Sequence, residues 1–341
     1  MKAIECCWKI AEKENLVLRR SYRRELKSVR GLFVSTGAKR KMTKLFIIVV
    51  TYNAQHWLPF FGDPLKDLPA GWKVIIVDNA SADHTCALIE KNYPQFILIK
   101  SQRNLGFGRA NNIGLKIALK EGADYAFLLN QDARISVTHI QRMVDIQRSH
   151  PEFYVISPIH FDGTGKELDL NFSNYALPLS CPNLYADALL GQLNDLYEGK
   201  TVNAAAWLLS RNCLMQIGGF NPLFTHYGED DEYRNRVLHH GYKLGIVPAA
   251  FAFHDRANRP PKKILTFLAP SSLTKLLNLD INYSFFLLSQ SLCKQCIKKL
   301  CLLKFDEFFY IVKIFLWFLL NKSKIKQSKA IIAKKGCHFL L

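Results

Sequence analysis

The stretch that decides the fold of this chain is Phe127-Leu128-Leu129-Asn130-Gln131-Asp132. Three large apolar residues end abruptly in a polar tip that carries one carboxylate. Buried strands of parallel sheets read as short apolar runs, and ligands in such sheets gather beyond the carboxyl ends of the strands. The stretch therefore predicts a strand of a doubly wound sheet, with Asp132 at the edge where chemistry takes place.

Three similar runs precede this strand, and a helical pattern follows each of the four. The predicted strands are Leu45–Val50, Lys73–Val77, Phe96–Ile99 and Tyr125–Leu129. The predicted helices begin near Gln55, at a cap formed by Ser81 or Asp83, at the glycine-rich loop 104–114, which opens a helix to Glu121, and around Val137. Strands and helices that alternate at short spacing are typical of βαβ units. We therefore predict an α/β fold with a mostly parallel sheet flanked by helices.

The second half of the chain is less regular. Further strands are predicted at Tyr154–Ser157, Asn203–Ser210 and Tyr242–Val247. A looser polar region from Asp162 to about Lys200 lies between the first two of them, and such segments usually carry variable contacts.

The positive charge lies at the two ends of the chain. The net charge is +18, yet residues 45–259 hold 19 Lys and Arg against 21 Asp and Glu. Residues 1–44 hold 13 against 4, and residues 260–341 hold 14 against 3. We predict a basic helical extension at 1–43 (possibly a mis-assigned start), a near-neutral domain at 44–260 and a basic amphipathic helical tail at 261–341.

The tail favours a membrane partner over a nucleic acid. Basic ends suit either one, but large apolar residues fill the row from Asp306 to Leu320. This row is shorter than the roughly 20 apolar residues that span a bilayer, and it suits a helix lying in the membrane interface. The alternative is a C-terminal helix that closes the core. We expect an anionic membrane surface as partner, and no nucleic acid.

The nine cysteines are scattered, and residues 1–44 contain no apolar segment of the kind found in secretory signals. We therefore expect a reducing cytoplasm.

Polar groups stand at the ends of three predicted strands. They are Thr51 and Asn53, Asp78 and Asn79, and Asn130 and Asp132. One carboxylate after a strand is often only a helix cap, but three polar ends in one sheet are harder to explain in that way. Asp78 suits the hydroxyl or N–H groups of a nucleoside, and Asp132 suits a hard divalent cation that bridges phosphates.

Two further groups are candidates for chemistry. The loop from Asn104 to Gly114 brings glycines that let backbone approach a ligand, although it lacks the dinucleotide fingerprint and can also be a plain turn. The acidic run Glu229-Asp230-Asp231-Glu232 is either the charged first turn of a helix or the source of a general base. His254 is either a satisfied polar residue or a metal ligand.

Five motifs in this order resemble glycosyltransferase family 2 of the GT-A fold, especially its bacterial rhamnosyltransferase-like branch. The resemblance covers about residues 44–256. Its motifs are Val49-Val-Thr-Tyr-Asn53, Val77-Asp-Asn-Ala-Ser81, Asn104-Leu-Gly-Phe107, Leu129-Asn-Gln-Asp132 and Gly228-Glu-Asp230.

The resemblance implies roles for individual residues. Asp230, with Glu229 beside it, would deprotonate the acceptor hydroxyl. Asp132 and possibly His254 would bind Mg²⁺ or Mn²⁺, which neutralises the departing diphosphate. The nucleotide-sugar would be held by Thr51, Asn53, Asp78, Asn79, Asn104, Gly106, Asn112 and Asn130. Asn130 stands where the family's D-x-D element has its first carboxylate, so the metal would depend mainly on Asp132.

The resemblance implies an inverting hexosyltransferase. Its donor would be dTDP-rhamnose or a UDP-sugar, and its acceptor a lipid-linked or cell-surface polysaccharide such as a lipopolysaccharide. It would work at the cytoplasmic face of the bacterial inner membrane as a peripheral protein. The alternative is a non-catalytic scaffold that binds nucleotide-sugars or glycans at the membrane.

Overall fold

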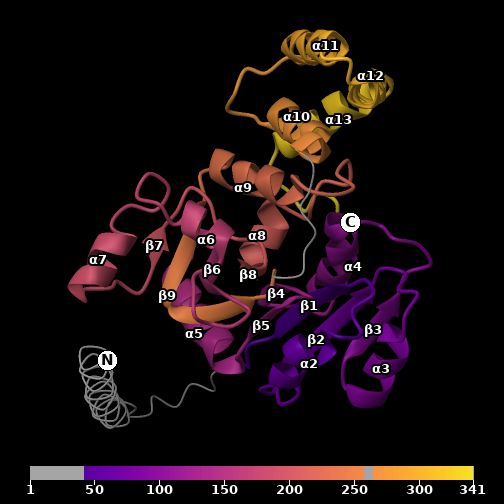
Figure 1. Ribbon diagram of the computed structural model, residues 1–341. Helices are drawn as coiled ribbons and strands as arrows, with labels where there is room; N and C mark the ends of the chain where they lie inside the picture. The colour runs from indigo at the N-terminus through magenta and orange to yellow at the C-terminus, as the bar shows by residue number, and fades with distance from the viewer. Residues whose placement is uncertain (1–41, 257–263, 341) are drawn as a thin grey trace, which may run out of the picture. The chain divides into compact units, whose positions relative to one another are not determined.

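A mixed sheet forms the centre of the chain in a computed structural model, which describes residues 42–256 and 264–340 (Figure 1). The chain divides into the units Met1–Met42 and Thr43–Leu341, and every element below belongs to the second. The predicted basic extension lies almost wholly outside the described residues. The strands are β1 (Leu45–Thr51), β2 (Trp72–Asp78), β3 (Ile97–Lys100), β4 (Tyr125–Asn130), β5 (Ala133–Ile135), β6 (Phe153–Asp162), β7 (Tyr197–Glu198), β8 (Ala206–Ser210) and β9 (Lys243–His254).

Helices cover both faces of this sheet, and further helices follow in the tail. Those of the first half are α2 (Leu58–Gly62), η1 (Asp63–Leu65), α3 (Thr85–Asn92), α4 (Phe107–Lys120), α5 (Val137–Ser149), α6 (Leu170–Tyr175) and α7 (Leu184–Leu190). Those of the second half are α8 (Arg211–Gln216), α9 (Glu229–His239), η2 (Ile264–Phe267), α10 (Leu268–Leu277), α11 (Phe285–Cys301), α12 (Phe305–Leu320) and α13 (Lys322–Ile332).

The α/β prediction is confirmed, but the sheet is parallel in only part of its width. The spatial order is β3-β2-β1-β4-β8-β6-β9-β5, with β7 on β9. The first four of these strands pair in parallel. Strand β8 is antiparallel to both of its neighbours, while β9 is parallel to β6 and antiparallel to β5. An apolar run carries no sign of its direction, so the sequence alone did not reveal this reversal.

The opening stretch lies where the sequence predicted, in the middle of the sheet. Phe127, Leu128 and Leu129 are all buried. Successive side chains of a strand point to opposite faces, so Leu128 joins the core shared with α4, α8 and α9, whereas its two neighbours join the core shared with α2, α3 and α5. The strand is apolar throughout because both of its faces are covered.

Two helix starts differ from the prediction. Helix α3 begins at Thr85, and neither Ser81 nor Asp83 is its N-cap. Asp83 still accepts a hydrogen bond from the Thr85 amide, at 3.0 Å. Helix α6 was not predicted, because six residues inside a polar stretch show no clear period; Asp169 caps it by accepting from the Phe172 amide.

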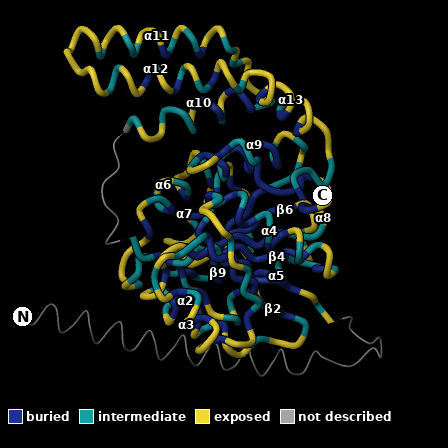
Figure 2. Tube along the Cα trace, turned by 90° about the vertical axis from the view of Figure 1, so that its right-hand side faces the viewer, coloured by how far each residue is buried: buried dark blue, intermediate teal, exposed yellow. Residues whose placement is uncertain are grey.

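In its described residues the tail forms η2 and the helices α10 to α13, which pack into one apolar cluster together with Phe224 from the segment before α9. Ile311, Ile314 and Phe318 of α12 are buried there together with Leu288 and Leu292 of α11. Figure 2 shows these two helices side by side and far from the sheet. The predicted helix in Asp306–Leu320 is therefore present, but one side of it packs against α11. Among the described residues, no helix is long and apolar enough to cross a membrane.

The end of the tail returns to the main domain. The Gly219 amide donates to the His338 carbonyl, and the Gly336 amide donates to the Gln216 carbonyl, each at 2.8 Å. Leu340 is buried in the core beside α4 and α8. The tail is thus joined to the segment that leads into α9.

Candidate active site

The ends of β1, β2 and β4 lie side by side, as the sequence predicted. In the parallel ladders Thr51 is paired with Asp78, and Val50 is paired with Asn130. Thr51 and Asp78 are buried. The polar groups that follow these strands therefore meet at one edge of the sheet.

Asp78 organises the loops at this edge. Its carboxylate accepts from the Thr51 hydroxyl at 3.0 Å and from the Ser81 amide and hydroxyl at 2.9 and 2.5 Å. The Ser81 hydroxyl accepts in turn from the Asn53 amide, and the Asn53 side chain accepts from the Ala82 amide. A carboxylate has about four acceptor positions, and most of those on Asp78 serve to hold these two loops together.

A second network continues from β2 into the glycine-rich loop. The Asn79 side chain donates to Asn104 Oδ1 at 2.9 Å and accepts from the Leu105 amide at 2.7 Å. Asn104 also accepts from the Gly106 amide. Gly106 has φ +82°, and a Cβ there would lie 2.1 Å from the Thr225 carbonyl oxygen. Only glycine fits this position.

The first residues of α4 lie against the acidic run. A Cβ added at Gly108 would meet Glu229 Cβ at 3.6 Å. Asn112, further along α4, binds the Phe220 backbone through both its amide nitrogen and its amide oxygen. This use of its side chain favours a structural role over contact with a ligand.

The end of β4 leaves one acceptor open. Asn130 Oδ1 is buried and has no hydrogen-bond partner among the described residues. Gln131 instead pairs with the Tyr52 backbone, accepting at 2.7 Å and donating at 3.3 Å. A buried acceptor without a partner costs free energy, so Asn130 is a candidate for binding a ligand.

Asp132 and His254 meet although they are far apart in sequence. Ala133 of β5 is paired with His254 of β9, which brings the ring next to the β4–β5 turn. His254 Nε2 lies 3.2 Å from Asp132 Oδ1, and both side chains are largely buried. The sequence named both residues, but only the pairing of β5 with β9 brings them together.

Asp169 is the site residue that sequence reasoning missed. Its Oδ2 lies 3.4 Å from His254 Nδ1 and 2.8 Å from Arg256 Nε, and Oδ1 accepts from the Asn203 side chain. Burial opposes ionisation, but the hydrogen bond with His254 and the Arg256 charge hold the pKa of Asp169 well below its usual range. Its only sequence signal was that of a helix cap.

This arrangement fits a divalent cation. Two ligands that coordinate a metal at about 2.1 Å and at right angles stand about 3 Å apart, close to the 3.2 Å between Asp132 and His254. A tautomer with its proton on Nδ1, donated to Asp169, would leave the Nε2 lone pair for a cation, whereas Arg256 Nε, 3.2 Å from the same Nδ1, favours the other tautomer. Among the described residues no group of three His, Cys, Asp or Glu side chains could hold a metal, so other ligands would come from phosphate or water.

The acidic run divides into paired and unpaired carboxylates. Asp231 pairs with Arg234, and buried Glu232 pairs with Arg236 at 3.0 Å. No described lysine or arginine forms an ion pair with Glu229 or Asp230. These two are therefore the members of the run that are available to act on a ligand.

The pKa values of Glu229 and Asp230 are both raised. Burial, followed by the charges of Asp230 and Asp231, raises the pKa of Glu229 to about 7. Its Oε2 is buried and has no hydrogen-bond partner in the described part of the chain. Burial and then the Asp231 charge also raise the pKa of Asp230. A carboxylate with a raised pKa suits proton transfer near neutral pH.

Helix α6 lies between the metal candidates and the base candidates. It begins next to Asp169, and Tyr175 at its other end stacks under the Arg234 guanidinium, 5.5 Å from the ring centroid. Burial raises the pKa of Tyr175, and the charges of Arg234, Asp230 and Arg256 also act on it. The polar region that the sequence left undefined thus supplies one wall of the site.

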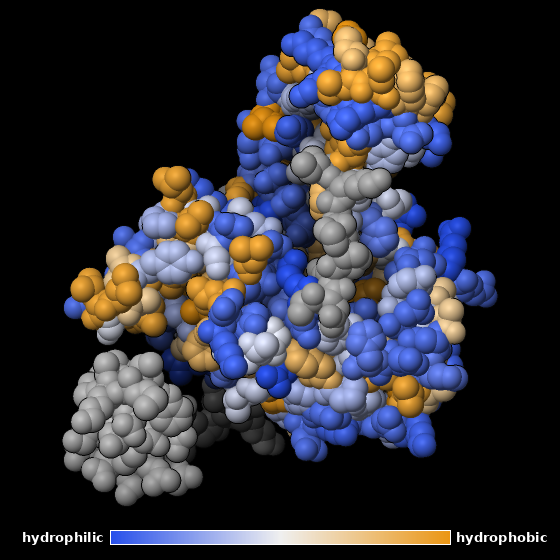
Figure 3. All heavy atoms as spheres, viewed as in Figure 1, coloured by the Kyte–Doolittle hydropathy of each residue, from blue (hydrophilic) through white to orange (hydrophobic). Residues whose placement is uncertain are grey.

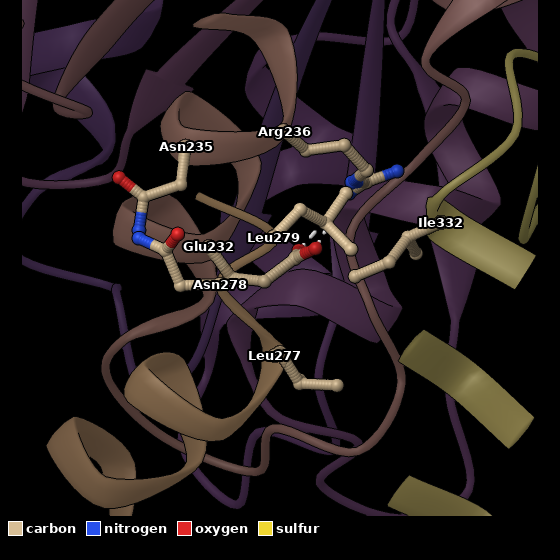
Figure 4. Close-up of a pocket in the computed structure, with 7 residues that line it drawn as sticks. All are labelled: Glu232, Asn235, Arg236, Leu277, Asn278, Leu279 and Ile332. Atoms are coloured by element: carbon tan, nitrogen blue, oxygen red, sulfur yellow. Dashed lines mark hydrogen bonds and ion pairs between the residues drawn. The ribbon is translucent and has the colours of Figure 1, made fainter. Parts of the chain in front are cut away.

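A cavity of about 10 Å³ lies on α9 away from these residues, where the tail packs against the helix (Figure 4). It has room for about one water molecule, so it is not a sugar site. Its lining residues are Glu232, Asn235, Arg236, Leu277, Asn278, Leu279 and Ile332.

Comparisons with known proteins agree with this geometry. The family model for glycosyl transferase family 2 matches residues 46–211. An N-acetylglucosaminyl-diphospho-decaprenol L-rhamnosyltransferase of Mycobacterium tuberculosis is 24% identical over 252 residues, 65% of this chain and 80% of that protein. The poly(ribitol-phosphate) beta-N-acetylglucosaminyltransferase TarS of Staphylococcus aureus is 28% identical over 180 residues, 48% of this chain and 31% of that protein.

A solved structure supports the fold. Residues 1–349 of S. aureus TarS in complex with UDP-GlcNAc superpose with a TM-score of 0.51 at 17% identity, covering 70% of this chain and 68% of the other. That protein has the GT-A fold. The family 2 model is matched from β1 to the first residue of α8, which is just under half of the chain, and together with the relatives this match supports a glycosyltransferase similar to those of family 2.

Proposed function

We propose that this chain is an inverting glycosyltransferase that moves one sugar from dTDP-rhamnose or a UDP-sugar to a lipid-linked or cell-surface polysaccharide acceptor. The observation that carries the proposal is the position of Glu229, which packs against Gly108 beside the donor loop. The unpaired acidic residues thus lie next to the strand ends where a nucleotide-sugar binds in this fold. The mycobacterial relative, whose name describes rhamnosyl transfer to a diphospho-lipid, supports the choice of donor and acceptor.

The donor would be held by the strand ends of the first half. Thr51 and Asp78 would form the floor beneath the nucleoside, and Asn79 and Asn104 would keep the glycine-rich loop in place against it. Asn130 would use its open acceptor for a ribose or sugar hydroxyl. Asn53 and Asn112 would act indirectly, since their side chains already bind backbone.

Asp230 would take the proton from the attacking acceptor hydroxyl. Glu229 would raise the basicity of Asp230 when it is ionised, because neighbouring carboxylates disfavour each other's charge. Displacement by this hydroxyl from the face opposite the departing diphosphate inverts the anomeric centre.

Asp132 and His254 would hold Mg²⁺ or Mn²⁺, with Asp169 fixing the ring of His254. A divalent cation at this position supplies charge that neutralises the departing diphosphate. The basic tail would place the protein on the cytoplasmic face of the inner membrane, where a lipid-linked acceptor is available.

A donor screen followed by a transfer assay tests this proposal. Thermal unfolding is measured with dTDP-rhamnose, UDP-GlcNAc and other UDP-hexoses, with and without Mn²⁺. A ligand at 100 times its Kd stabilises by about 2.7 kcal/mol, so the true donor raises the Tm clearly. That donor is then incubated with polyprenyl-diphosphate sugars, and the anomeric configuration of the product is read by NMR. A product that retains the donor configuration, or no transfer from any donor, would contradict the proposal.

A further inference from the structure

The turn between α11 and α12 exposes a row of large apolar side chains. Leu300, Leu302, Leu303 and Phe305 form what we call the hairpin tip, and their exposed fractions are 47%, 52%, 74% and 51%. Figure 2 shows this turn as an exposed end of the helix pair. Water-exposed apolar residues gathered in this way mark an interaction site.

The outer face of α12 continues the apolar surface. Phe309, Leu316 and Leu320 are exposed, while Ile311 and Phe318 on the other side are buried. The exposed Lys313 interrupts this row with one charge. A helix face that is otherwise apolar and exposed favours contact with an apolar environment. Within the described chain, only one side of α12 is covered by protein. The exposed apolar side chains on the other side would be stabilised by an apolar environment.

The backbone of the tip is held in a conformation that L-residues disfavour. Leu303 has φ +53°, a region that suits glycine and rarely leucine. Here this conformation ends α11, since the Leu303 and Lys304 amides donate to the Leu300 and Lys299 carbonyls in a common pattern of helix termination. At Leu303 it accompanies the most exposed side chain of the tip.

Lysines surround the tip. Residues 285–304 contain Lys294, Lys298, Lys299 and Lys304 and neither Asp nor Glu, and two acidic residues, Asp306 and Glu307, follow Phe305. Lys299 and Lys304 also pair with Glu307 at the start of α12. Figure 3 shows apolar and hydrophilic side chains interleaved over this end of the molecule. A bilayer has an apolar interior beneath anionic headgroups. The apolar side chains of the tip suit the interior, and the nearby lysines suit the headgroups.

We propose that the hairpin tip inserts into an anionic lipid bilayer, with the flanking lysines at the level of the lipid phosphates. Apolar insertion and basic charge together provide the two signals that stable membrane attachment requires. This refines the predicted interfacial helix, since the turn and the outer face of α12 enter the bilayer while the inner face stays on α11.

A second apolar patch, on α7, lies beside acidic residues and is not expected to bind an anionic bilayer. Leu189 and Leu190 are 89% and 68% exposed, but Asp187 and Asp195 stand beside them in sequence and no lysine lies between residues 167 and 199. An anionic surface would repel that patch. The two patches therefore form a natural pair for comparison.

Another part of the tail, α10, contacts the segment just before the candidate base. Thr274 of α10 donates to the Gly228 carbonyl, at the residue before Glu229. Membrane attachment through the tip therefore deepens the proposed function, which needs a lipid-borne acceptor. Binding to vesicles is measured without sugar transfer, so that failure of the one is distinguishable from failure of the other.

Co-sedimentation of the full-length chain with vesicles tests the proposal. Wild type is expected to bind phosphatidylglycerol vesicles and to bind pure phosphatidylcholine vesicles much more weakly. The double variant Leu302→Glu/Leu303→Glu should lower the partition coefficient on phosphatidylglycerol by about tenfold or more. Lys298→Gln should lower it by about fivefold. The matched control Leu189→Glu/Leu190→Glu should leave binding unchanged.

Two results would overturn the proposal. One is equal vesicle binding by wild type and the tip variant. Both proteins have the same basic N-terminal residues, so equal binding would mean that charge elsewhere in the chain, and not the tip, attaches the protein. The other is a wild-type dimer that the tip variant converts to a monomer in sedimentation equilibrium while vesicle binding persists, because the tip would then be a contact between copies of the chain. Circular dichroism confirms that both exposed double variants keep the native helix content.

Discussion

The two halves of the candidate active site are built in different ways. We call the strand ends proposed to hold the nucleotide the donor half, and the proposed metal ligands together with the proposed base the acceptor half. In the donor half, Thr51 bonds to Asp78 and Asn79 bonds to Asn104 and Leu105, and these partners are 25 to 27 positions apart in sequence. In the acceptor half, Asp132, Asp169 and His254 come from three distant segments, and Glu229 stands at the start of α9. The donor half is formed by neighbouring βα units. The acceptor half forms only after strands from distant parts of the chain have paired.

This difference has an energetic side. Polar groups of the donor half satisfy one another, as Asp78 does with Thr51 and Ser81. The acceptor half instead keeps unsatisfied or shifted groups, among them Glu229 with its unpartnered oxygen. Strain and unpaired polar atoms are expected where a ligand completes the site. The donor half is therefore organised in advance, and the acceptor half is the more reactive one.

The largest expected effect is on the acceptor half. Asp230→Asn keeps the shape of the side chain but removes the proton acceptor, so sugar transfer should slow by about 10²- to 10⁴-fold. Initial rates with saturating donor measure this. Asp145→Asn is the control, because Asp145 is an exposed carboxylate on α5 that pairs with Arg148, and it should stay near the wild-type rate. A wild-type rate for Asp230→Asn would show that Asp230 is not the general base.

The second effect is on stability and depends on pH. The pKa of Glu229 is about 7 in the folded protein against an ordinary value of 4.5. The folded chain keeps the proton that the unfolded chain releases, so the contribution to the free energy of unfolding falls as pH rises from 4.5 to 7. That loss is about 3 kcal/mol.

Glu229→Gln removes this loss because a glutamine does not ionise. Its free energy of unfolding relative to wild type should therefore increase by about 3 kcal/mol from pH 4 to pH 8. Urea unfolding at several pH values measures the difference. If the free energy of unfolding changes with pH in the same way for the two proteins, Glu229 has an ordinary pKa and its burial does not destabilise the folded chain.

The third effect concerns the metal candidates. Asp169→Ala should weaken Mn²⁺ binding by about 10- to 100-fold, because the partner that orients His254 is lost. Titration calorimetry with Mn²⁺ in the presence of UDP measures the affinity without any turnover. Asp162→Asn, an exposed carboxylate of the same segment, should bind Mn²⁺ normally. If Asp169→Ala binds like wild type while His254→Ala does not, Asp169 has no orienting role.

The smallest effect should come from the donor half. Thr51→Val removes one of several donors to the buried Asp78, and this should lower the free energy of unfolding by about 1 kcal/mol. Thr164→Val removes a similar hydroxyl–carboxylate bond in an exposed turn and should change almost nothing. A large loss from Thr51→Val would mean that the donor half is not the self-supporting unit that its hydrogen bonds indicate.

Much of the donor half could be predicted from the sequence. Its apolar runs and the polar residues at their ends follow the short period of βα units, and Thr51, Asp78 and Asn130 lie at one sheet edge as expected. Asp169 could not be predicted, because one carboxylate in a polar stretch resembles any helix cap. The reversal of β8 was equally hidden, since strand direction depends on the path of the chain between strands.

The sequence by itself determined the α/β class, the edge at which polar groups gather and the acidic run that contains Asp230. Local pattern and composition decide these features, because burial and strand period act over a few residues. Only the tertiary structure decided that Asp169 backs His254, that Asp231 and Glu232 are already paired, and that α12 exposes one apolar face. These features depend on contacts between segments that are distant in sequence, and such contacts form only when the sheet and the tail pack together.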